Sequence, residues 1–254
     1  MGSAVSRREH ARAEGAPIKP LTIADALESP YSGASDTLSE RAAALIERDI
    51  LAGAWEPGAK LAIPVLAARY GIGATPLREG LSRLVSRGLI VALGQRGFRV
   101  ASVSRDDLVD ITGVRVLIES EALRRSMANG GDEWEAGIVS ALHRLRRAVE
   151  RNPETIREGA AAFDELHKAF HRALLAACGS ERLLALHDDL YLQAYRYRRV
   201  MMRQFTDAAW FMAEHQDLAD VVIARRTEEA VRKLTDHLNS TLAVVYEQGT
   251  GGAL

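Results

Sequence analysis

The chain has 254 residues, 47% of them hydrophobic, which is enough for one large or two modest globular domains. Its single cysteine, Cys178, excludes an internal disulfide framework and a cysteine-rich zinc site, and it suits a reducing cytoplasm. Because no run of about eighteen apolar residues occurs and charges stand where a signal peptide would be apolar, we expect a cytoplasmic protein with no membrane contact.

Charge is distributed unevenly along the chain. The formal net charge of −1 argues against a nucleic-acid partner for the chain as a whole. However, residues 38–105 carry ten Lys and Arg against five Asp and Glu, whereas residues 106–254 carry nineteen against twenty-four. Only the first of these segments is suited to face phosphates.

The first third of the sequence contains clear signals for helix starts and turns. Residues 1–36 hold three of the seven prolines and show no sustained period, which predicts a disordered tail. From Thr37, "TLSE" is a capping box that predicts a helix ending at Gly53. A short helix around "PVLAARYG" follows, and then a helix with Thr75 as its cap and Pro76 at its first position. The runs "LIVAL" and "FRVAS" around "GQRG" predict a two-strand hairpin.

After Val103 the sequence is helical in character throughout. "SRDD", from Ser104, is a second capping box. Later helix starts are signalled at Asn152-Pro153, Ser180-Glu181, Thr206-Asp207 and Thr227-Glu228-Glu229. About six amphipathic helices therefore predict an all-α bundle over residues 104–248, with a flexible C-terminus at 249–254. The fold class is mainly α, with a winged helix-turn-helix domain at residues 37–103 preceding the bundle.

The helix after the Thr-Pro step is a candidate for reading DNA. Its apolar residues form one stripe that must pack inward: Leu77, Leu81, Leu84 and Val85. Its other faces carry Arg78, Ser82, Arg83, Ser86 and Arg87. A surface helix with merely solvated arginines is the simpler interpretation, but the preceding helix, the basic bias and the hairpin together favour a winged helix-turn-helix. Arg96, at the hairpin tip, could then enter a minor groove or touch phosphate.

The stretch from "GAWEPGAKL" to "GQRGFRV" resembles the DNA-binding domain of GntR-family transcription regulators, including the pattern T-P-x-R-E-x-L-x-x-L-x-x-x-G-L-I. The resemblance implies operator contacts from Thr75, Pro76, Arg78, Glu79, Ser82, Arg83 and Arg96. Many members have Ser-Arg just before the Thr-Pro, where this chain has Gly73-Ala74. Since one arginine–guanine contact contributes about 1–3 kcal/mol of discrimination, the usual family operator is not assumed, and Arg78 becomes the main candidate for a base or phosphate contact.

Four histidines of the second domain could form a metal site. His167 and His171 share one helix face, and His215 and His237 lie on two later helices. Neutral imidazoles on facing helices of a bundle can bind zinc or another divalent transition metal, although histidines spaced i, i+4 are more often ordinary polar groups. A hydrolytic enzyme is disfavoured, because "HKAFH" lacks the glutamate of H-E-x-x-H and no other catalytic fingerprint occurs.

Residues 104–247 resemble the helical effector domain, called FCD, of the FadR branch of this family, in "VRVLIESEALRRSMA", "FHRALLAACGSERLL" and "EHQDLADVVIARRTEEAVRKLTDHL". Metal-binding members use an Asp, a His four residues later and two further histidines. The resemblance places His171, His215 and His237 on the histidine positions and His167 on the Asp position. Either His167 or Asp164, one turn earlier and acting through water, completes the site. It implies zinc, with nickel or another divalent ion as the alternative.

Within that branch, "GIGATPLREGLSRLV", "GQRGFRVA", "GGDEWEA" and "HKAFH" together make the chain look most like repressors of carbon-starvation operons for γ-aminobutyrate and glutarate catabolism. The resemblance implies a homodimer on a pseudo-palindromic operator, a small carboxylate effector such as glutarate, and transmission through linker residues 101–107. Arg115 with Glu119, and Arg196 with Arg198, are candidates for gripping the carboxylate, although surface charges or structural ion pairs are an equal alternative. A regulator with a purely structural metal and no effector also remains open.

Overall fold

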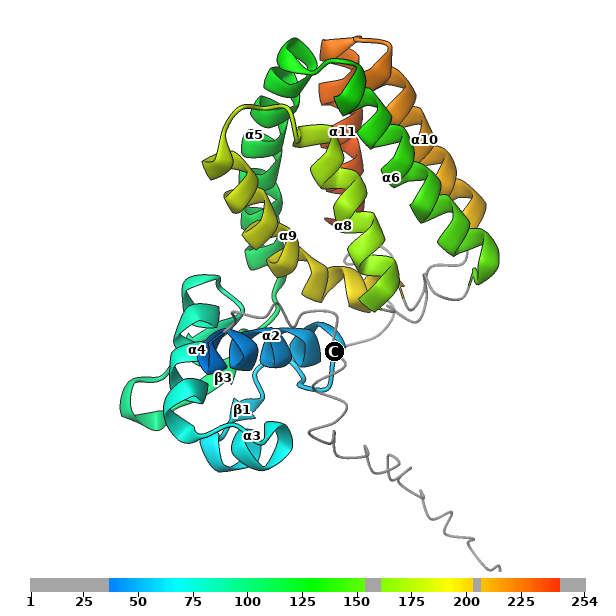
Figure 1. The fold of residues 1–254 in the computed structure, drawn as a ribbon. Coiled ribbons are helices and arrows are strands. Elements are labelled where there is room, and N and C mark those ends of the chain that lie inside the picture. Colours follow the sequence, from blue (N-terminus) through cyan, green and yellow to red (C-terminus); the bar gives the residue numbers. More distant parts are fainter. Residues whose placement is uncertain (1–36, 154–160, 203–206, 243–254) are drawn as a thin grey trace, which may run out of the picture.

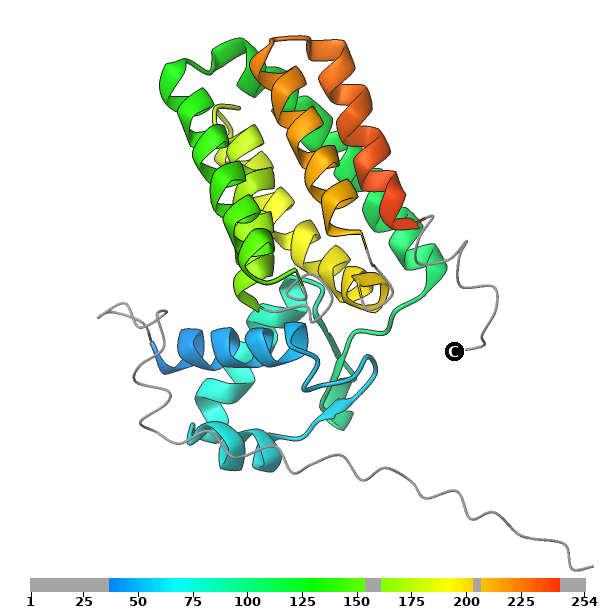
Figure 2. The same ribbon diagram turned by 90° about the vertical axis from the view of Figure 1, so that its right-hand side faces the viewer.

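The computed structural model describes residues 37–153, 161–202 and 207–242 and divides them into two helical parts (Figures 1 and 2). The predictions of a disordered tail at 1–36 and a flexible end at 249–254, and of a helix after Asn152-Pro153, concern residues outside these ranges. Among the described helices, none is both long and apolar enough to cross a membrane.

The N-terminal part is a winged helix-turn-helix, as predicted. It contains α2 (Leu38–Leu51), β1 (Lys60–Leu61), α3 (Ile63–Tyr70), α4 (Ala74–Ser86), β2 (Ile90–Ala92), the 3₁₀ turn η1 (Gly94–Arg96) and β3 (Phe98–Val100). The Thr37 capping box at the start of α2 is present, with reciprocal hydrogen bonds between Thr37 and Glu40. At the turn between α3 and α4, Gly71 adopts a left-handed conformation with φ 65°, which glycine accepts without steric cost.

Two sequence-based predictions need correction here. Thr75 is not the cap of α4, because the helix begins at Ala74 with Gly73 in the extended cap position, so Thr75 and Pro76 lie in its first turn. A proline fits there because the first N–H groups of a helix have no intrahelical partner. The wing is also larger than a hairpin, since β1 adds a third antiparallel strand in the order β1-β3-β2. A two-residue strand carries no alternation by which the sequence could reveal it.

The C-terminal part is the predicted helical bundle. Within the described ranges it comprises α5 (Arg105–Asn129), α6 (Asp132–Arg151), α8 (Ala161–Leu175), α9 (Glu181–Met202), α10 (Ala208–Ile223) and α11 (Thr227–Leu242). Helix α5 packs against α9 and α11, and α6 packs against α8 and α10. Helix starts predicted at Ser104, Ser180-Glu181, Asp207 and Thr227 are confirmed.

Helix α9 lies at the end of the bundle that faces the winged domain (Figures 1 and 2). Its Leu192 is buried in the hydrophobic core of the winged domain, among residues of α2, α3, α4 and the sheet. A small third core, formed by Leu108, Ile111, Ala194 and Tyr197, joins the start of α5 to the same helix. Helix α9 therefore belongs structurally to both domains.

The closest approach of α2 and α4 depends on Gly80. A Cβ atom added there would lie 2.9 Å from the backbone nitrogen of Ala43 and 2.9 Å from the backbone oxygen of Ser39. Backbone atoms cannot rotate away, so a side chain at this position would push the two helices apart.

We expect Gly80→Ala to lower the stability of the protein by about 1–2 kcal/mol, because an overpacking cost of about 2–3 kcal/mol against backbone atoms exceeds the gain of about 1 kcal/mol in helix propensity. Thermal unfolding followed by circular dichroism measures this. The matched control is Gly137→Ala in α6, where an added Cβ meets nothing within 4 Å and should leave the melting temperature equal or higher. Equal melting temperatures for Gly80→Ala and wild type would contradict the close packing.

Candidate DNA-binding face and four-histidine site

The outer face of α4 carries the residues predicted to contact DNA. Thr75, Arg78, Glu79 and Ser82 are exposed, and Pro76 is half-buried. The Ser82 hydroxyl donates to the carbonyl of Arg78 at 2.9 Å, so it lies against its own helix. The opposite face holds Leu77, Leu81 and Leu84 fully buried, as the stripe predicted. The polar edge of α4 is thus presented outward by a fixed apolar face.

Arg83 lies apart from this edge. It is exposed but pairs with Glu40 of α2 at 3.5 Å. Together with Arg87, these two residues line a cleft between the winged domain and the bundle. The structure therefore places Arg83 toward the domain interface rather than beside Arg78.

The wing adds basic residues that sequence reasoning missed. Arg96 is exposed at the tip, as predicted. Lys60 of β1 and Arg99 of β3 are also exposed and are directly paired across the sheet, so they share its outer face. Arg99 also donates to the carbonyl of Gly58 at 2.9 Å. Only the β1–β3 pairing brings Lys60 to the wing, and that strand could not be recognised from the sequence.

A buried carboxylate connects α2 to α3. Asp49 is 4% exposed. It accepts hydrogen bonds from Arg69 at 2.7 Å, from Tyr70 at 2.9 Å and from Arg48 at 3.0 Å. Trp55 in turn donates to the Tyr70 hydroxyl at 3.3 Å. Because a buried charge must be compensated by partners, this network holds the first two helices of the DNA-binding unit at one angle.

The four predicted histidines converge inside the bundle. His167 and His171 of α8, His215 of α10 and His237 of α11 each offer a ring nitrogen, and these nitrogens lie within 4.8 Å of one another. We call this set the four-histidine cluster. The Nε2 atoms of His167 and His215 are 2.8 Å apart, and those of His167 and His171 are 3.1 Å apart. Burial, followed by the neighbouring histidines, lowers the pKa of His171 well below its ordinary value, which keeps the ring neutral.

The hydrogen bonds made by Nδ1 of His215 and of His167, on the side of each ring away from the cluster, assign their tautomers. His215 Nδ1 lies 2.6 Å from the carbonyl oxygen of Phe211, which can only accept, so Nδ1 carries the proton. Tyr191 donates its hydroxyl proton to the Asp164 carboxylate, so His167 Nδ1, 2.6 Å away, must donate to the Tyr191 oxygen. Both Nε2 atoms therefore present lone pairs to each other. Two lone pairs this close repel each other unless a cation binds both nitrogens, so the residues present suit a metal ion.

The cluster forms one wall of a small cavity of about 50 Å³. Its other walls include Arg115, Tyr191, Tyr195, Trp210, Phe211 and Glu214. This volume holds an ion and a few waters. Arg115 donates through Nε to Glu119 at 2.7 Å, and within the described residues its two terminal nitrogens make no hydrogen bond. Of the predicted effector residues, the structure thus brings Arg115 to the cluster.

Arg196 is placed elsewhere, against its predicted role at the effector. It is buried, and its guanidinium donates to the carbonyls of Ala101 at 2.9 Å and Ser102 at 3.4 Å. The carboxylate of Asp107 lies 3.8 Å away. A buried guanidinium needs acceptors, and the linker supplies them here, so Arg196 joins α9 to the linker. The side chain of Arg198 lies outside the described part of the chain.

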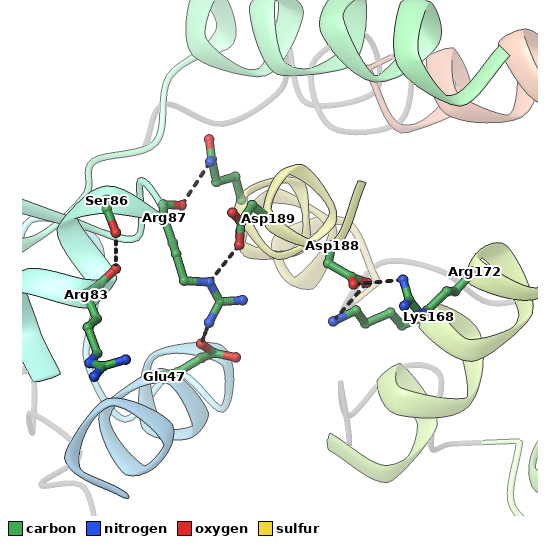
Figure 3. A network of polar contacts seen from close by, with 9 residues as sticks. Glu47, Arg83, Ser86, Arg87, Lys168, Arg172, Asp188 and Asp189 are labelled. Carbon is green, nitrogen blue, oxygen red and sulfur yellow. Dashed lines mark hydrogen bonds and ion pairs between the residues drawn. The ribbon is translucent and has the colours of Figure 1, made fainter. Parts of the chain in front are cut away.

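Helix α9 also grips the C-terminal end of α4, as Figure 3 shows. Arg87, just after α4, donates to Asp189 of α9 at 2.7 Å and pairs with Glu47 of α2. Gln193 of α9 donates to the carbonyl of Arg87 at 2.9 Å. We call Arg87, Glu47, Asp189 and Gln193 the α9 clamp. The adjacent Asp188 points the other way and pairs with Lys168 and with Arg172 of α8, inside the bundle.

Residues 38–100 match the family model "Bacterial regulatory proteins, gntR family", and residues 110–240 match the FCD domain. The chain belongs to the GntR family. It is 34% identical over 212 residues to the HTH-type transcriptional repressor GlaR of Escherichia coli, covering 81% of this chain and 94% of GlaR. It is 37% identical over 231 residues to the uncharacterized HTH-type transcriptional regulator BphR of Paraburkholderia xenovorans, covering 90% and 93%.

Solved structures agree on the fold. E. coli McbR/YncC superposes with a TM-score of 0.70 at 22% identity, covering 84% of this chain and 99% of that one. A putative GntR regulator from Rhodococcus sp. RHA1 gives 0.64 at 23%, covering 82% and 97%. The two family matches and the two relatives make the chain a FadR-type GntR regulator, which is a DNA-binding transcription regulator rather than an enzyme.

The buried ion pair between Arg115 and Glu119, beside the cavity, gives a prediction for this GntR regulator. Burial alone would raise the pKa of Glu119, but Arg115 and then His187 outweigh it and lower that pKa to about 2. We expect Glu119→Gln to cost about 3–5 kcal/mol at pH 7, because it leaves Arg115 buried without its partner. A depressed carboxyl pKa stabilises the fold above the unfolded value of 4.5, so the cost should shrink as pH falls from there toward 2.

Thermal melts of both proteins between pH 7 and pH 3 test this. Glu121→Gln is the control on the same helix, because Glu121 pairs with Arg125 at 2.7 Å while both are about half exposed. Its cost should stay below about 1 kcal/mol at every pH. A difference in melting temperature between wild type and Glu119→Gln that does not depend on pH would refute an ionised Arg115–Glu119 pair.

Proposed function

We propose that this regulator is a homodimeric repressor that a small carboxylate releases from its operator by binding beside a divalent transition-metal ion in the four-histidine cluster. Zinc is the expected ion and nickel the alternative. The observation that carries the proposal is the convergence of four imidazoles, whose ring nitrogens lie within 4.8 Å of one another. Repression is supported by the name of the relative GlaR, a transcriptional repressor.

The polar edge of α4 supplies the base contacts. Thr75, Arg78, Glu79 and Ser82 lie on its outward face, and a helix of this kind reads base edges in the major groove. Arg78 carries the main contact, because Gly73 and Ala74 have no side chain able to reach a base. The exposed wing residues Arg96, Arg99 and Lys60 contact phosphate.

Two such domains on one duplex require a dimer. A single winged domain reads a half-site, and the two-fold symmetry of a homodimer matches a pseudo-palindromic operator. The FCD bundle supplies the dimer contacts in this proposal.

The effector is a carboxylate, and glutarate or a related dicarboxylate is the expected class. When bound, the ion supplies positive charge for one carboxylate oxygen. Arg115 lines the same cavity, and a guanidinium is a bidentate partner for a carboxylate. The cavity of about 50 Å³ accommodates one end of such an acid, and in this proposal the rest of the acid displaces one of the cavity walls.

The wall that moves is α9. Tyr191 and Tyr195 of this helix line the cavity, while Asp189 and Gln193 hold the end of α4. These four residues lie within two turns of α9, so in this proposal displacement of the tyrosines displaces the α9 clamp. The effector acts only to the extent that it binds the displaced arrangement more tightly.

We expect the zinc-loaded protein to bind its own promoter DNA tightly and glutarate or one related dicarboxylate to weaken binding by about 5- to 150-fold. Fluorescence anisotropy at fixed salt measures the dissociation constant, since phosphate contacts depend strongly on salt. His171→Ala should bind DNA but lose the response to the acid. Arg78→Ala should lose the specific binding itself.

Two results would reject parts of this proposal. Tight binding that no acid changes would leave a repressor with a structural metal and no effector. Binding with no preference for the promoter over unrelated DNA would mean that the loss of the usual Ser-Arg at Gly73-Ala74 has removed operator recognition.

The α9 clamp makes a second prediction. Asp189→Asn removes the charge that holds Arg87, so the effect of the acid on operator affinity should fall by about 2- to 30-fold. Asp188→Asn is the matched control, because Asp188 is adjacent to Asp189 but forms its ion pairs with α8 of the bundle and not with α4. The ratio of dissociation constants with and without acid is measured for each variant. An equal loss of response in both variants would show that the clamp is not the route.

A further inference from the structure

A buried carboxylate lies behind one ring of the four-histidine cluster. Asp164 of α8 is 4% exposed and is not among the groups whose ligand atoms converge. Its Oδ1 accepts from the Tyr191 hydroxyl at 3.0 Å, and that hydroxyl lies 2.6 Å from His167 Nδ1. Asp164, Tyr191 and His167 are therefore joined by two hydrogen bonds in series. The series ends at His167 Nδ1, whereas His167 Nε2 faces the cluster.

The charge balance of the cluster makes this line important. Four neutral imidazoles contribute no negative charge against a divalent ion. The Asp164 carboxylate polarises the Tyr191 hydroxyl, so the tyrosine oxygen becomes a stronger hydrogen-bond acceptor for the His167 Nδ1–H. This makes His167 Nε2 a stronger electron-pair donor to the ion. The same two hydrogen bonds keep the His167 ring in the tautomer and orientation in which Nε2 faces His215.

We propose that Asp164 and Tyr191 form an outer-shell relay that sets the affinity of the four-histidine cluster for a divalent transition ion. The relay takes the place of a carboxylate bound directly to the ion. Asp164 and Tyr191 are positioning residues, and they act through His167. The proposal rests on the proposed function only in that the cluster binds an ion.

Zinc affinity of the full-length protein tests the relay. Competition with a chromophoric chelator measures the dissociation constant for wild type, Tyr191→Phe, Asp164→Asn and the double variant. We expect each single variant to bind zinc about 10- to 100-fold more weakly. Because the two groups act in series, the double variant should bind zinc no more weakly than the single variant with the lower affinity.

A control and a spectroscopic measurement separate the relay from other roles. Tyr197→Phe removes a hydroxyl from the same helix, but one that contacts Ser104 and Asp107 at the start of α5, and it should bind zinc like wild type. With cobalt in place of zinc, Tyr191→Phe should keep the wild-type visible absorption bands, whereas His171→Ala should shift them because a ligand is lost.

Three results would overturn the inference in different ways. Weak binding by Asp164→Asn with normal binding by Tyr191→Phe would mean that the carboxylate reaches the ion without the tyrosine. Unchanged affinity in both variants would mean that the relay is only structural. A wild-type protein that binds no zinc, cobalt or nickel would remove the metal site itself, and with it the ion-binding part of the proposed function.

Discussion

The structure depends on α9 being a shared wall between the two domains. Successive residues of this helix face different partners: Tyr191 contacts the four-histidine cluster, Leu192 is buried in the core of the winged domain, and Gln193 holds the end of α4. Because consecutive helical residues point about 100° apart, one turn of α9 can serve both domains. A change at the cluster that moves this turn cannot leave the recognition helix where it was.

Buried charges define the arrangement on both sides of this wall. Asp49 ties α2 to α3 through Arg69 and Tyr70, and Glu119 holds Arg115 beside the cavity. Burying a charge costs several kcal/mol unless its partners are well placed, so such groups favour one geometry over its neighbours. Helix angles in the DNA-binding unit and the position of Arg115 are therefore set more sharply than apolar packing alone would set them.

Local patterns predicted the elements well, and they predicted the partners of side chains poorly. The Thr37 capping box and the i, i+4 spacing of His167 and His171 are local, so the sequence contains them in full. The grouping of those histidines with His215 and His237 needed a family resemblance, because it depends on how distant helices pack. Arg196 was assigned to the effector because a sequence shows a guanidinium but not its acceptors, which are linker carbonyls. The Asp164–Tyr191 pair joins two helices and had no local signal.

The proposed site links the size of the effector to its action. An anion small enough for the cavity of about 50 Å³ would bind the ion without moving α9, and it would bind both arrangements of the protein equally. A ligand with equal affinity for two states shifts neither, however tightly it binds. In the proposed mechanism a longer dicarboxylate displaces Tyr191 or Tyr195 as it reaches both the ion and Arg115, so part of its binding energy appears only in the displaced state. Under the proposed function, the ion supplies affinity for carboxylates in general, whereas the length of the acid determines whether the regulator responds.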